Sequence, residues 1–297
     1  YFFITLIPMH IAILGIGLMG YPMGRRLCEA GYTVHAWNRT PEKAQRLAPF
    51  GAHIHAHAAD AVRHADIVIT MLDNGAVVEE VVFGQGVAAA MRAGCVLVDM
   101  SSIQPVQARH HAERLRALGI EYLDAPVSGG TVGAEQGTLA IMVGGAPEAL
   151  QRVQSVLSIL GRTTHVGATG CGQLTKLANQ MIVGTTIGIV AESLLLCARG
   201  GADMAKVREA IAGGFADSRI LQLHGQRMVE RDFAPRARMT VQLKDLRNAL
   251  ANAQETGFEA PITAQMEQLF AQGIAHGLSD LDHSGLFVEL ARRNGMV

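Results

Sequence analysis

The chain has 297 residues, 49% of them hydrophobic, which is enough to bury two cores, so two domains are expected. The 25 lysines and arginines balance 26 acidic residues, and the net charge of −1 without a basic run argues against nucleic acid as a partner. The four scattered cysteines include no Cys-x-x-Cys pair, which indicates reduced thiols and a cytoplasmic location rather than a disulfide framework.

The first eight residues are apolar, but the run is too short to span a bilayer and has neither a basic n-region nor a small-residue cleavage site. No membrane association is therefore expected. Met9 is predicted to be the natural start, and residues 1–8 are interpreted as a leader, an expression remnant or an overlong gene reading.

Residues 10–14 form a short run typical of a buried strand, and a helix pattern follows through Ala30. Between them the spacing is Gly-x-Gly-x-x-Gly, which in this context predicts a dinucleotide site: the first glycine allows the turn, the second the approach of a pyrophosphate, and the third close helix packing. The free N–H groups at the helix start would bind the phosphates. The alternative is a plain βα turn. The predicted cofactor contacts here are Gly15, Ile16, Gly17, Leu18, Met19 and Gly20.

A second strand is predicted at residues 33–37, followed by Asn38, Arg39 and Thr40. Sites that prefer NAD usually carry Asp or Glu at this point, which accepts hydrogen bonds from the ribose hydroxyls. A neutral Asn does not repel a 2′-phosphate, and Arg39 can bind one through charge-assisted hydrogen bonds. These three residues therefore favour NADP(H), with NAD(H) possible. Arg39 stacked on the adenine would suit either cofactor.

Residues 66–72 and 95–99 are also predicted strands, with helix-like segments beside them. This alternation indicates a Rossmann-type, doubly wound, mainly parallel sheet, whose ligands bind at the carboxyl ends of the strands. Leu72, Asp73 and Ser102 follow those ends and are predicted cofactor contacts. A simple helix cap is the alternative role for Ser102.

Three histidines alternate at His53, His55 and His57, with His64 beyond, and on a strand their imidazoles could share one face. No acidic residue or cysteine is expected to join them, so no metal site is predicted.

Ser128, Gly129 and Gly130 combine a hydroxyl with unhindered backbone N–H groups, which suits the carboxylate of a small substrate. The alternative is a glycine-rich turn between two strands.

Gly170 and Gly172 predict a tight turn into a long apolar helix that carries Lys176 and Asn179 on one face. Lys176 could exchange a proton with a substrate oxygen while Asn179 orients the substrate. A solvated lysine and an ordinary polar asparagine are the alternative.

From there on the chain is predicted to be all helical, with residues 9–171 as the Rossmann domain and residues 172–297 as a helical domain. The apolar residues 181–198 are interpreted as a buried interdomain or intersubunit helix. Lys244 lies near the start of another helix, where it could reach the cofactor or form a surface ion pair. Helices are predicted at residues 203–212, 220–231, 241–256, 261–273 and 283–294.

Together these segments resemble the β-hydroxyacid dehydrogenase family from Met9 to the end. The resemblance rests on residues 15–23, 99–102, 124–130, 172–180, 244–246 and 282–284. One departure is Asp73, which stands where relatives commonly have proline and leaves the local loop geometry open.

The resemblance implies a Rossmann domain, a helical domain, a cleft between them, and a homodimer or homotetramer. It implies that Lys176 is the general acid/base, Asn179 a substrate-positioning residue, residues 128–130 the carboxylate loop and Lys244 a contact near the nicotinamide. The expected activity is the NADP(H)-dependent reduction of a small 3-oxo acid.

Within the family, residues 175–180 and 244–250 are most similar to the branch that reduces tartronate semialdehyde. The 3-hydroxyisobutyrate dehydrogenases and the succinic semialdehyde and glyoxylate reductases are the alternatives. Ala178, which stands where 6-phosphogluconate dehydrogenases have histidine, argues against decarboxylation, and Lys176 argues against an imine reductase. A non-catalytic dinucleotide-binding scaffold or sensor is the alternative of another class.

Overall fold

The computed structural model describes residues 9–296, and the interpretation of residues 1–8 lies outside this range. The chain divides into two compact units, and the division falls between Lys176 and Leu177. Each unit is described by itself.

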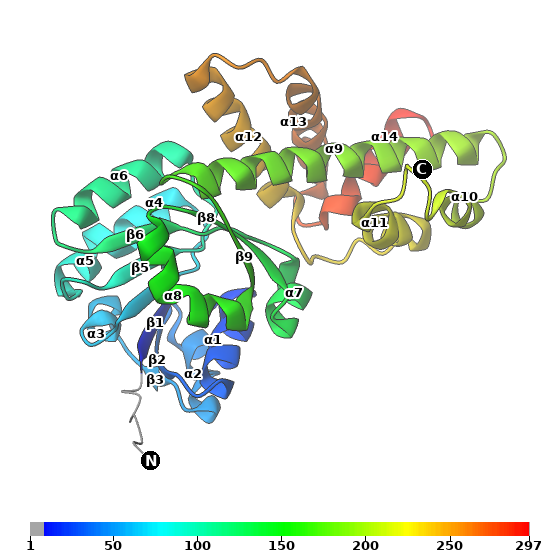
Figure 1. The fold of residues 1–297 in the computed structure, drawn as a ribbon. Helices are drawn as coiled ribbons and strands as arrows, with labels where there is room; N and C mark the ends of the chain where they lie inside the picture. Colours follow the sequence, from blue (N-terminus) through cyan, green and yellow to red (C-terminus); the bar gives the residue numbers. More distant parts are fainter. Residues whose placement is uncertain (1–8, 297) are drawn as a thin grey trace. The chain divides into compact units, whose positions relative to one another are not determined.

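The first unit is built on a nine-stranded sheet in which six neighbouring strands, in the order β3-β2-β1-β4-β5-β6, are parallel (Figure 1). The antiparallel strand β8 continues the sheet beyond β6 and pairs with β7 and β9. The strands are β1 (His10–Leu14), β2 (Thr33–Trp37), β3 (His53–Ile54), β4 (Ile67–Thr70), β5 (Val96–Asp99), β6 (Glu121–Asp124), β7 (Val127–Ser128), β8 (Leu139–Gly144) and β9 (Gly161–Gly167).

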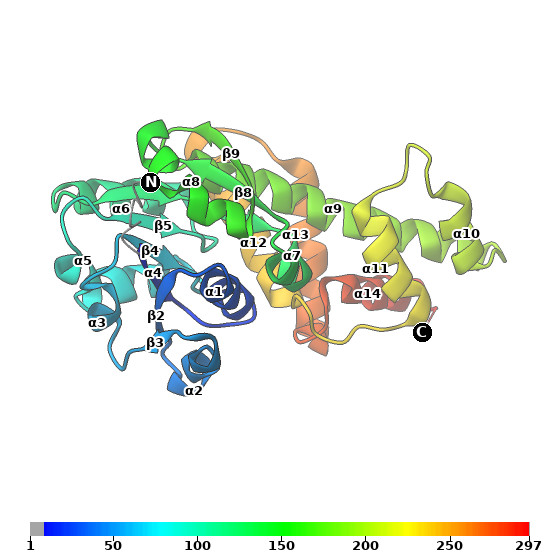
Figure 2. The same cartoon turned by 60° about the horizontal axis from the view of Figure 1, so that its bottom comes forward.

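Helices cover both faces of this sheet (Figures 1 and 2). Alternate residues of β1 enter the two cores: Ile11 and Ile13 pack with the side of α1 and α8, whereas Ala12 and Leu14 pack with the side of α3 to α6. The predicted doubly wound α/β fold is therefore confirmed. The helices of this unit are α1 (Gly20–Glu29), α2 (Pro41–Gln45), α3 (Ala58–Val62), α4 (Gly75–Glu79), α5 (Val87–Ala90), α6 (Pro105–Arg116), α7 (Gly130–Gln136) and α8 (Pro147–Leu160).

The segment after Ser128 differs from the expected turn between two strands. Gly129, at a φ of 135°, reverses the chain, and α7 intervenes before β8. Gly137, at a φ of 69°, ends this helix in the left-handed conformation that glycine adopts easily. The glycines therefore delimit a short helix.

The second unit is helical, as predicted, around a core that includes Phe270, Phe287 and Leu246. The predicted helix at residues 261–273 has the observed bounds of α13, and the predicted helix at residues 283–294 is a 3-10 turn followed by α14. Its helices after α9 are α10 (Met204–Ile211), α11 (Arg219–Glu230), α12 (Met239–Thr256), α13 (Pro261–Gly273) and α14 (Leu286–Arg293).

Helix α9 (Cys171–Arg199) is 29 residues long and runs through the division between the units. Its length and composition alone would allow it to cross a membrane, a test that the core helix of a soluble protein also passes. Its apolar residues lie all round the helix, and only 39% of its most apolar 18-residue window is buried, so much apolar surface on α9 is exposed.

Candidate active site

The glycine-rich turn between β1 and α1 has the geometry of a dinucleotide-binding turn. Gly15 has a φ of 106°, and its N–H donates to the carbonyl of Trp37 at 2.9 Å. A Cβ on Gly20 would lie 1.9 Å from the carbonyl oxygen of Gly15, whereas a Cβ on Gly17 would meet nothing within 4 Å. The turn is closed at its two outer glycines and open at the middle one, which leaves room for a pyrophosphate against the backbone. These residues therefore fit a dinucleotide.

Asn38 braces this turn. Its Oδ1 accepts a hydrogen bond from the N–H of Ile16 at 2.9 Å, and its Nδ2 donates to the carbonyl of Thr40 at 2.9 Å. A carboxylate could keep the first bond but has no proton for the second. Arg39 and Thr40 are exposed beside this brace. Asn38 thus fixes the backbone from which the exposed Arg39 side chain extends.

The carboxyl ends of β4 and β5 are joined by buried hydrogen bonds. The N–H of Leu72 donates to Ser101 Oγ at 2.9 Å, and Asp99 Oδ1 accepts from the N–H of Ser101 and from Thr70 Oγ1. Burial raises the pKa of Asp99, and the hydrogen bonds from Ser101 and Thr70 oppose that rise. The two strand-end loops are therefore held together through Ser101.

The neighbouring Ser102 is half-buried in the same loop. Helix α6 is capped by Gln104, whose N–H donates to Gln107 Oε1 at 3.1 Å, so the alternative role of Ser102 as a helix cap is wrong. Asp73 is exposed in the loop before α4, and Asn74, not Asp73, caps that helix by accepting from the N–H of Val77 at 3.0 Å.

The predicted carboxylate loop lies along β8. Ser128 pairs with Ala140 near one end of that strand, and Gly130 is exposed, with nothing within 4 Å of a Cβ placed on it. The start of α9 lies against Gly144 at the other end of β8. Four residues of extended strand, roughly 13 Å, separate the two pairing positions. Ser128 and the first turn of α9 therefore lie against different ends of the same strand.

Lys176 is half-buried in the second turn of α9, five residues after the helix begins at Cys171. The helix begins after Gly170, whose φ of 94° makes the turn predicted for it. Gly172 has another role, because a Cβ there would lie 2.4 Å from the carbonyl oxygen of Asp124. Gly172 is thus needed for close packing and not for a turn.

In the second unit, Asn179 and Lys244 are linked through two intermediates. Asn179 Nδ2 donates to Gln180 Oε1 at 2.8 Å, and Gln180 Nε2 donates to Asp245 Oδ2 at 2.8 Å. Lys244 Nζ lies 3.2 Å from Asp245 Oδ1. Gln242 joins the group through its Nε2, which donates to the carbonyl of Gln180 at 2.9 Å. Lys244 does form an ion pair, but its partner carboxylate is buried.

Two family models match consecutive parts of the chain. The model described as the NAD binding domain of 6-phosphogluconate dehydrogenase matches residues 10–170, and the model described as NAD-binding of NADP-dependent 3-hydroxyisobutyrate dehydrogenase matches residues 170–290. The 2-hydroxy-3-oxopropionate reductase of Escherichia coli strain K12 is 42% identical over 280 residues, which cover 94% of this chain and 96% of the relative.

The 3-hydroxyisobutyrate dehydrogenase of Pseudomonas aeruginosa is 35% identical over 285 residues, covering 93% of this chain and 95% of the relative. The solved structure of Mycobacterium tuberculosis 3-hydroxyisobutyrate dehydrogenase with L-serine has a TM-score of 0.88 at 32% identity, covering 96% of this chain and 99% of that one. The chain belongs to the 3-hydroxyisobutyrate dehydrogenase-like β-hydroxyacid dehydrogenase family.

The family resemblance inferred from the sequence is thereby confirmed, as is an enzyme that acts on hydroxyl groups with NAD(P). Sequence reasoning about this hydroxyacid dehydrogenase missed several residues that hold the predicted site residues in place. Asp124 and Gln173 lie within the family motifs, yet their hydrogen bonds join segments far apart in the chain. Gln180 and Asp245 were likewise adjacent to predicted site residues.

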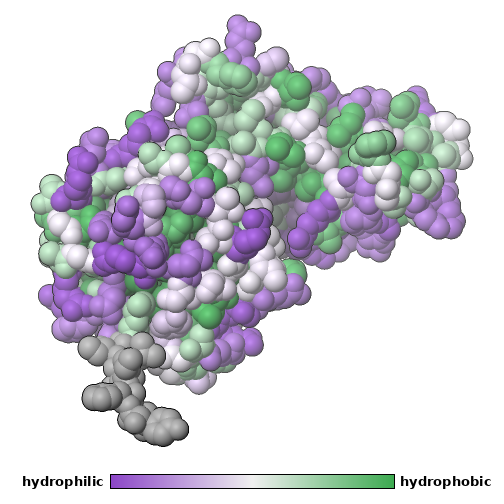
Figure 3. Space-filling view, in the orientation of Figure 1, coloured by the Kyte–Doolittle hydropathy of each residue, from purple (hydrophilic) through white to green (hydrophobic). Residues whose placement is uncertain are grey.

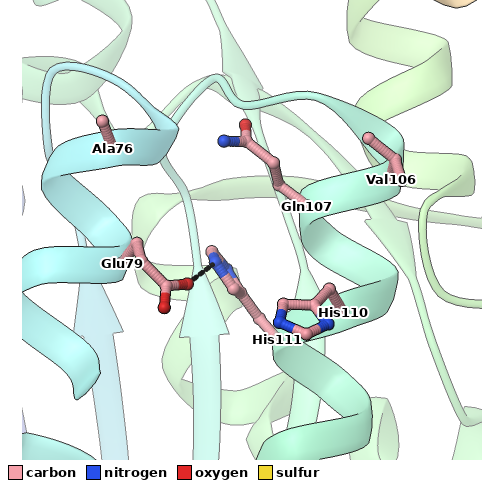
Figure 4. A pocket seen from close by; sticks show the side chains of 6 residues that line it. All are labelled: Ala76, Glu79, Val106, Gln107, His110 and His111. Carbon is pink, nitrogen blue, oxygen red and sulfur yellow. Dashed lines mark hydrogen bonds and ion pairs between the residues drawn. The ribbon is translucent and has the colours of Figure 1, made fainter.

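A pocket of about 340 Å³ lies between α4 and α6 of the dehydrogenase, and its lining residues include none of the predicted site residues (Figure 4). In Figure 4, Glu79 points toward His111, and their Oε2 and Nε2 atoms lie 2.9 Å apart. Glu79 also pairs with Arg114. Burial lowers the pKa of His111, and the nearby carboxylates of Asp99 and Glu79 oppose this effect. The polar wall of this pocket therefore combines the buried His111 with Glu79, whose ion pair with Arg114 is partly exposed.

Two of the alternating histidines, His53 and His55, join His10 and His35 in a cluster of imidazoles. His35 Nε2 lies 3.1 Å from His10 Nδ1, and His35 Nδ1 lies 3.0 Å from His55 Nε2. The ring of His53 stacks on His35 at a centroid distance of 5.2 Å. Among residues 9–296, no group of three or more His, Cys, Asp or Glu side chains is arranged to hold a metal ion. Both ring nitrogens of His35 face other imidazoles.

Proposed function

We propose that this hydroxyacid dehydrogenase uses NADPH to reduce tartronate semialdehyde, which is 2-hydroxy-3-oxopropionate, to glycerate. The observation that carries the choice of substrate is the 42% identity, over 94% of the chain, to a 2-hydroxy-3-oxopropionate reductase. The choice of NADPH is supported by Asn38 and the exposed Arg39 at the end of β2, where no carboxylate would repel a 2′-phosphate.

When bound, the cofactor supplies a hydride to the aldehyde carbon. The side chain of Lys176 gives a proton to the aldehyde oxygen as it gains negative charge, so the products are the alcohol and the oxidised cofactor. The ammonium also stabilises the developing alkoxide. The reverse reaction oxidises the 3-hydroxy acid, with Lys176 as the base.

The remaining predicted residues bind and orient. Ser128, Gly129 and Gly130 would hold the substrate carboxylate with a hydroxyl and backbone N–H groups. Asn179 would fix the orientation of the substrate, and its amide is itself held by Gln180. Lys244, paired with the buried Asp245, would contact the cofactor near the nicotinamide.

Residues at the strand ends would bind the rest of the cofactor. Leu72, Asp73 and Ser102 would contact the nicotinamide ribose, and the turn from Gly15 to Gly20 would bind the pyrophosphate. The hydrogen bond from the N–H of Leu72 to Ser101 Oγ supports this role, because it holds two of these loops in one arrangement.

The deciding experiment measures initial rates of NADPH oxidation with tartronate semialdehyde, methylmalonate semialdehyde, succinic semialdehyde and glyoxylate at equal concentrations. A kcat/KM for tartronate semialdehyde at least ten-fold above the others, about 1.4 kcal/mol, is expected. A ten-fold preference for a competitor would replace the named substrate with a 3-hydroxyisobutyrate, succinic semialdehyde or glyoxylate activity. Cofactor binding without turnover of any of them would favour the non-catalytic scaffold or sensor.

We also propose that a second copy of the chain covers the exposed face of α9. Ile182, Ile189 and Leu196 recur every seven residues and are 68%, 54% and 72% exposed. Figure 3 shows that hydrophobic residues reach the surface of the molecule in several places. A seven-residue spacing places side chains on one helix face. This row of exposed apolar side chains, although Glu192 also lies exposed between Ile189 and Leu196, supports assembly into a homodimer or homotetramer.

A further inference from the structure

The first turn of α9 is held by a carboxylate from a distant strand. Asp124, the last residue of β6, accepts from the N–H of Gly170 through Oδ1 and from the N–H of Gln173 through Oδ2, both at 2.8 Å. These are among the donors that a helix cannot satisfy within its own first turn. Asp124 therefore fixes the start of α9 to the end of β6.

Gln173 makes a second attachment. Its Oε1 accepts from the N–H of Ile103 at 3.1 Å, and its Nε2 donates to the carbonyl of Ser101 at 2.8 Å. The residue is completely buried. Because Ser101 and Ile103 belong to the loop after β5, Gln173 ties the same helical turn to the neighbouring strand. Asp124 and Gln173 together are called the α9 mount below.

The mount has no room for adjustment. A Cβ on Gly172 would lie 2.5 Å from the carbonyl oxygen of Met142 and 2.9 Å from Asp124 Oδ2. A Cβ on Gly144 would lie 2.6 Å from Asp124 Oδ1. Distances below 3.0 Å are closer than real Cβ contacts, so glycine is required at both positions. The helix start is thus pressed against β6 and β8 as closely as a backbone can be.

Other helices of this chain are capped more simply. Asp203 caps α10 and Ser218 caps α11, each by accepting from backbone N–H groups two or three residues ahead. In contrast, the mount uses a buried carboxylate 46 residues before Gly170. Burial raises the pKa of Asp124 to about 6, so its ionised form is retained at a cost that a local cap avoids. A role in positioning accounts for that cost.

Lys176 follows Gln173 by three residues, which is less than one helical turn and a rise of about 4.5 Å. The position of its Cα is therefore set by the turn that the mount holds. We propose that Asp124 and Gln173 are positioning residues that place the Lys176 ammonium for proton transfer. This inference rests on the function proposed for Lys176.

The test uses Asp124→Asn and Gln173→Met in the full chain. Asp124→Asn keeps one acceptor and turns an amide N–H₂ toward the other backbone donor, and Gln173→Met keeps the length of the side chain but makes neither hydrogen bond. Each is expected to lower kcat by about 10- to 100-fold, because small displacements of a catalytic group have effects of that size. The KM for the semialdehyde and the Kd of NADPH are expected to stay within about two-fold of the parent.

Thr175→Val is the matched control. Its Oγ1 donates to the carbonyl of Cys171 within α9, so the substitution removes a hydrogen bond from the same turn without touching the mount. It is expected to keep the parental kcat. Thermal melts identify folded variants, and if one mount variant does not fold, the other carries the test. A mount variant that folds with the parental kcat, with only its Tm reduced, would show that the mount merely stabilises the fold.

Combining each mount substitution with Lys176→Ala separates the two proposals. If the mount acts through Lys176, it has little further effect on kcat once the amine is gone. Losses that multiply in the double variant would overturn the inference alone. Parental turnover in Lys176→Ala would instead overturn the role of Lys176, and the inference with it.

Discussion

The carboxamide of Asn38 joins the N–H of Ile16 to the carbonyl of Thr40, with both hydrogen bonds at 2.9 Å. One side chain therefore shapes both the glycine-rich turn and the loop that carries Arg39. Arg39 itself makes neither of these hydrogen bonds. The choice between NADPH and NADH can therefore be tested by replacing Arg39 while Asn38 keeps the turn and the loop in place.

Arg39→Ala is expected to raise the KM for NADPH at least ten-fold and to change the KM for NADH less than about two-fold, since only NADPH presents a 2′-phosphate. Initial rates with each cofactor measure this. Asn38→Asp is also expected to lower the ratio of kcat/KM for NADPH to kcat/KM for NADH, because its negative charge would repel the 2′-phosphate of NADPH. Equal losses for both cofactors in Arg39→Ala would mean that Arg39 stacks on the adenine.

Lys176→Ala is expected to lower kcat at least ~100-fold, the lower range for a positioned general acid. Fluorescence titration with NADPH should give a Kd close to the parental value, because the proposed cofactor contacts are on other residues. Lys206→Ala is a suitable control, since Lys206 is an exposed lysine whose ion pair with Glu209 lies at the surface. Near-parental turnover in Lys176→Ala would refute the mechanism.

Gln180→Leu is expected to raise the KM for the semialdehyde while leaving the Kd of NADPH within about three-fold. The substitution removes the acceptor of the Asn179 amide and the donor to Asp245, and an unsatisfied buried polar group costs about 1–3 kcal/mol. Thermal melts should therefore also show a lower Tm. Gln226→Leu, on the exposed side of α11, controls for loss of an amide, and an equal change in KM there would exclude a specific role for Gln180.

Stability is expected to fall as the pH drops from about 6.5 toward 4. Burial, and then the neighbouring His55, His53, His10 and His64, lower the pKa of His35 from 6.5 to about 4, so between these values the unfolded chain binds the extra proton. Protonation of the unfolded chain therefore favours unfolding as the pH falls through this window. Above about pH 6.5 His35 is neutral in both states, and its full contribution to the free energy of unfolding is retained. Asp60 faces His55 and opposes the effect on that residue.

The measurement is the Tm at pH 7 and pH 5 for the parent and for His35→Gln. The loss of Tm between the two pH values is expected to be smaller in the variant, which lacks the titrating group. His57→Gln, an exposed histidine nearby, serves as the control and should lose as much Tm as the parent. The same loss in His35→Gln would assign the pH dependence to other groups.

The self-association of α9 is tested by the double substitution Ile182→Gln and Leu196→Gln. Light scattering coupled to size-exclusion chromatography is expected to give the mass of a single chain for this variant and a multiple of it for the parent. Leu118 is an exposed leucine outside α9, with 48% of its surface accessible, and Leu118→Gln should leave the parental mass unchanged. A parent that is monomeric, or that sediments with lipid vesicles, would contradict a second copy as the occupant.

The sequence predicted those elements whose signals are local. Strands β1 and β2 have the predicted bounds, because each is a short apolar run beside a glycine or a turn residue. The roles of Gly15 and Gly20 also agree with their geometry. Helix α7 was missed because Ser128 to Gly130 suggests a simple turn, and nothing in those residues shows that Gly130 begins a seven-residue helix before β8.

The partners of the site residues were less accessible from the sequence. Asp124 bonds residues 46 and 49 positions away, and Gln173 reaches Ser101 across 72 positions. No periodicity encodes such pairings, since they depend on the order of strands in the sheet. Ser101 was likewise passed over for Ser102, because two adjacent serines are equivalent in a motif and only burial distinguishes them.

The close packing at Gly144 and Gly172 restricts which substitutions this enzyme can accept. Every other amino acid adds at least one carbon atom, and at both positions that atom would overlap backbone. Alanine, ordinarily the mildest replacement and a better helix former than glycine, is excluded at Gly172 for this reason. A library randomised at these two codons and selected for growth on the enzyme's activity would therefore return only codons for glycine, however permissive the surrounding surface is.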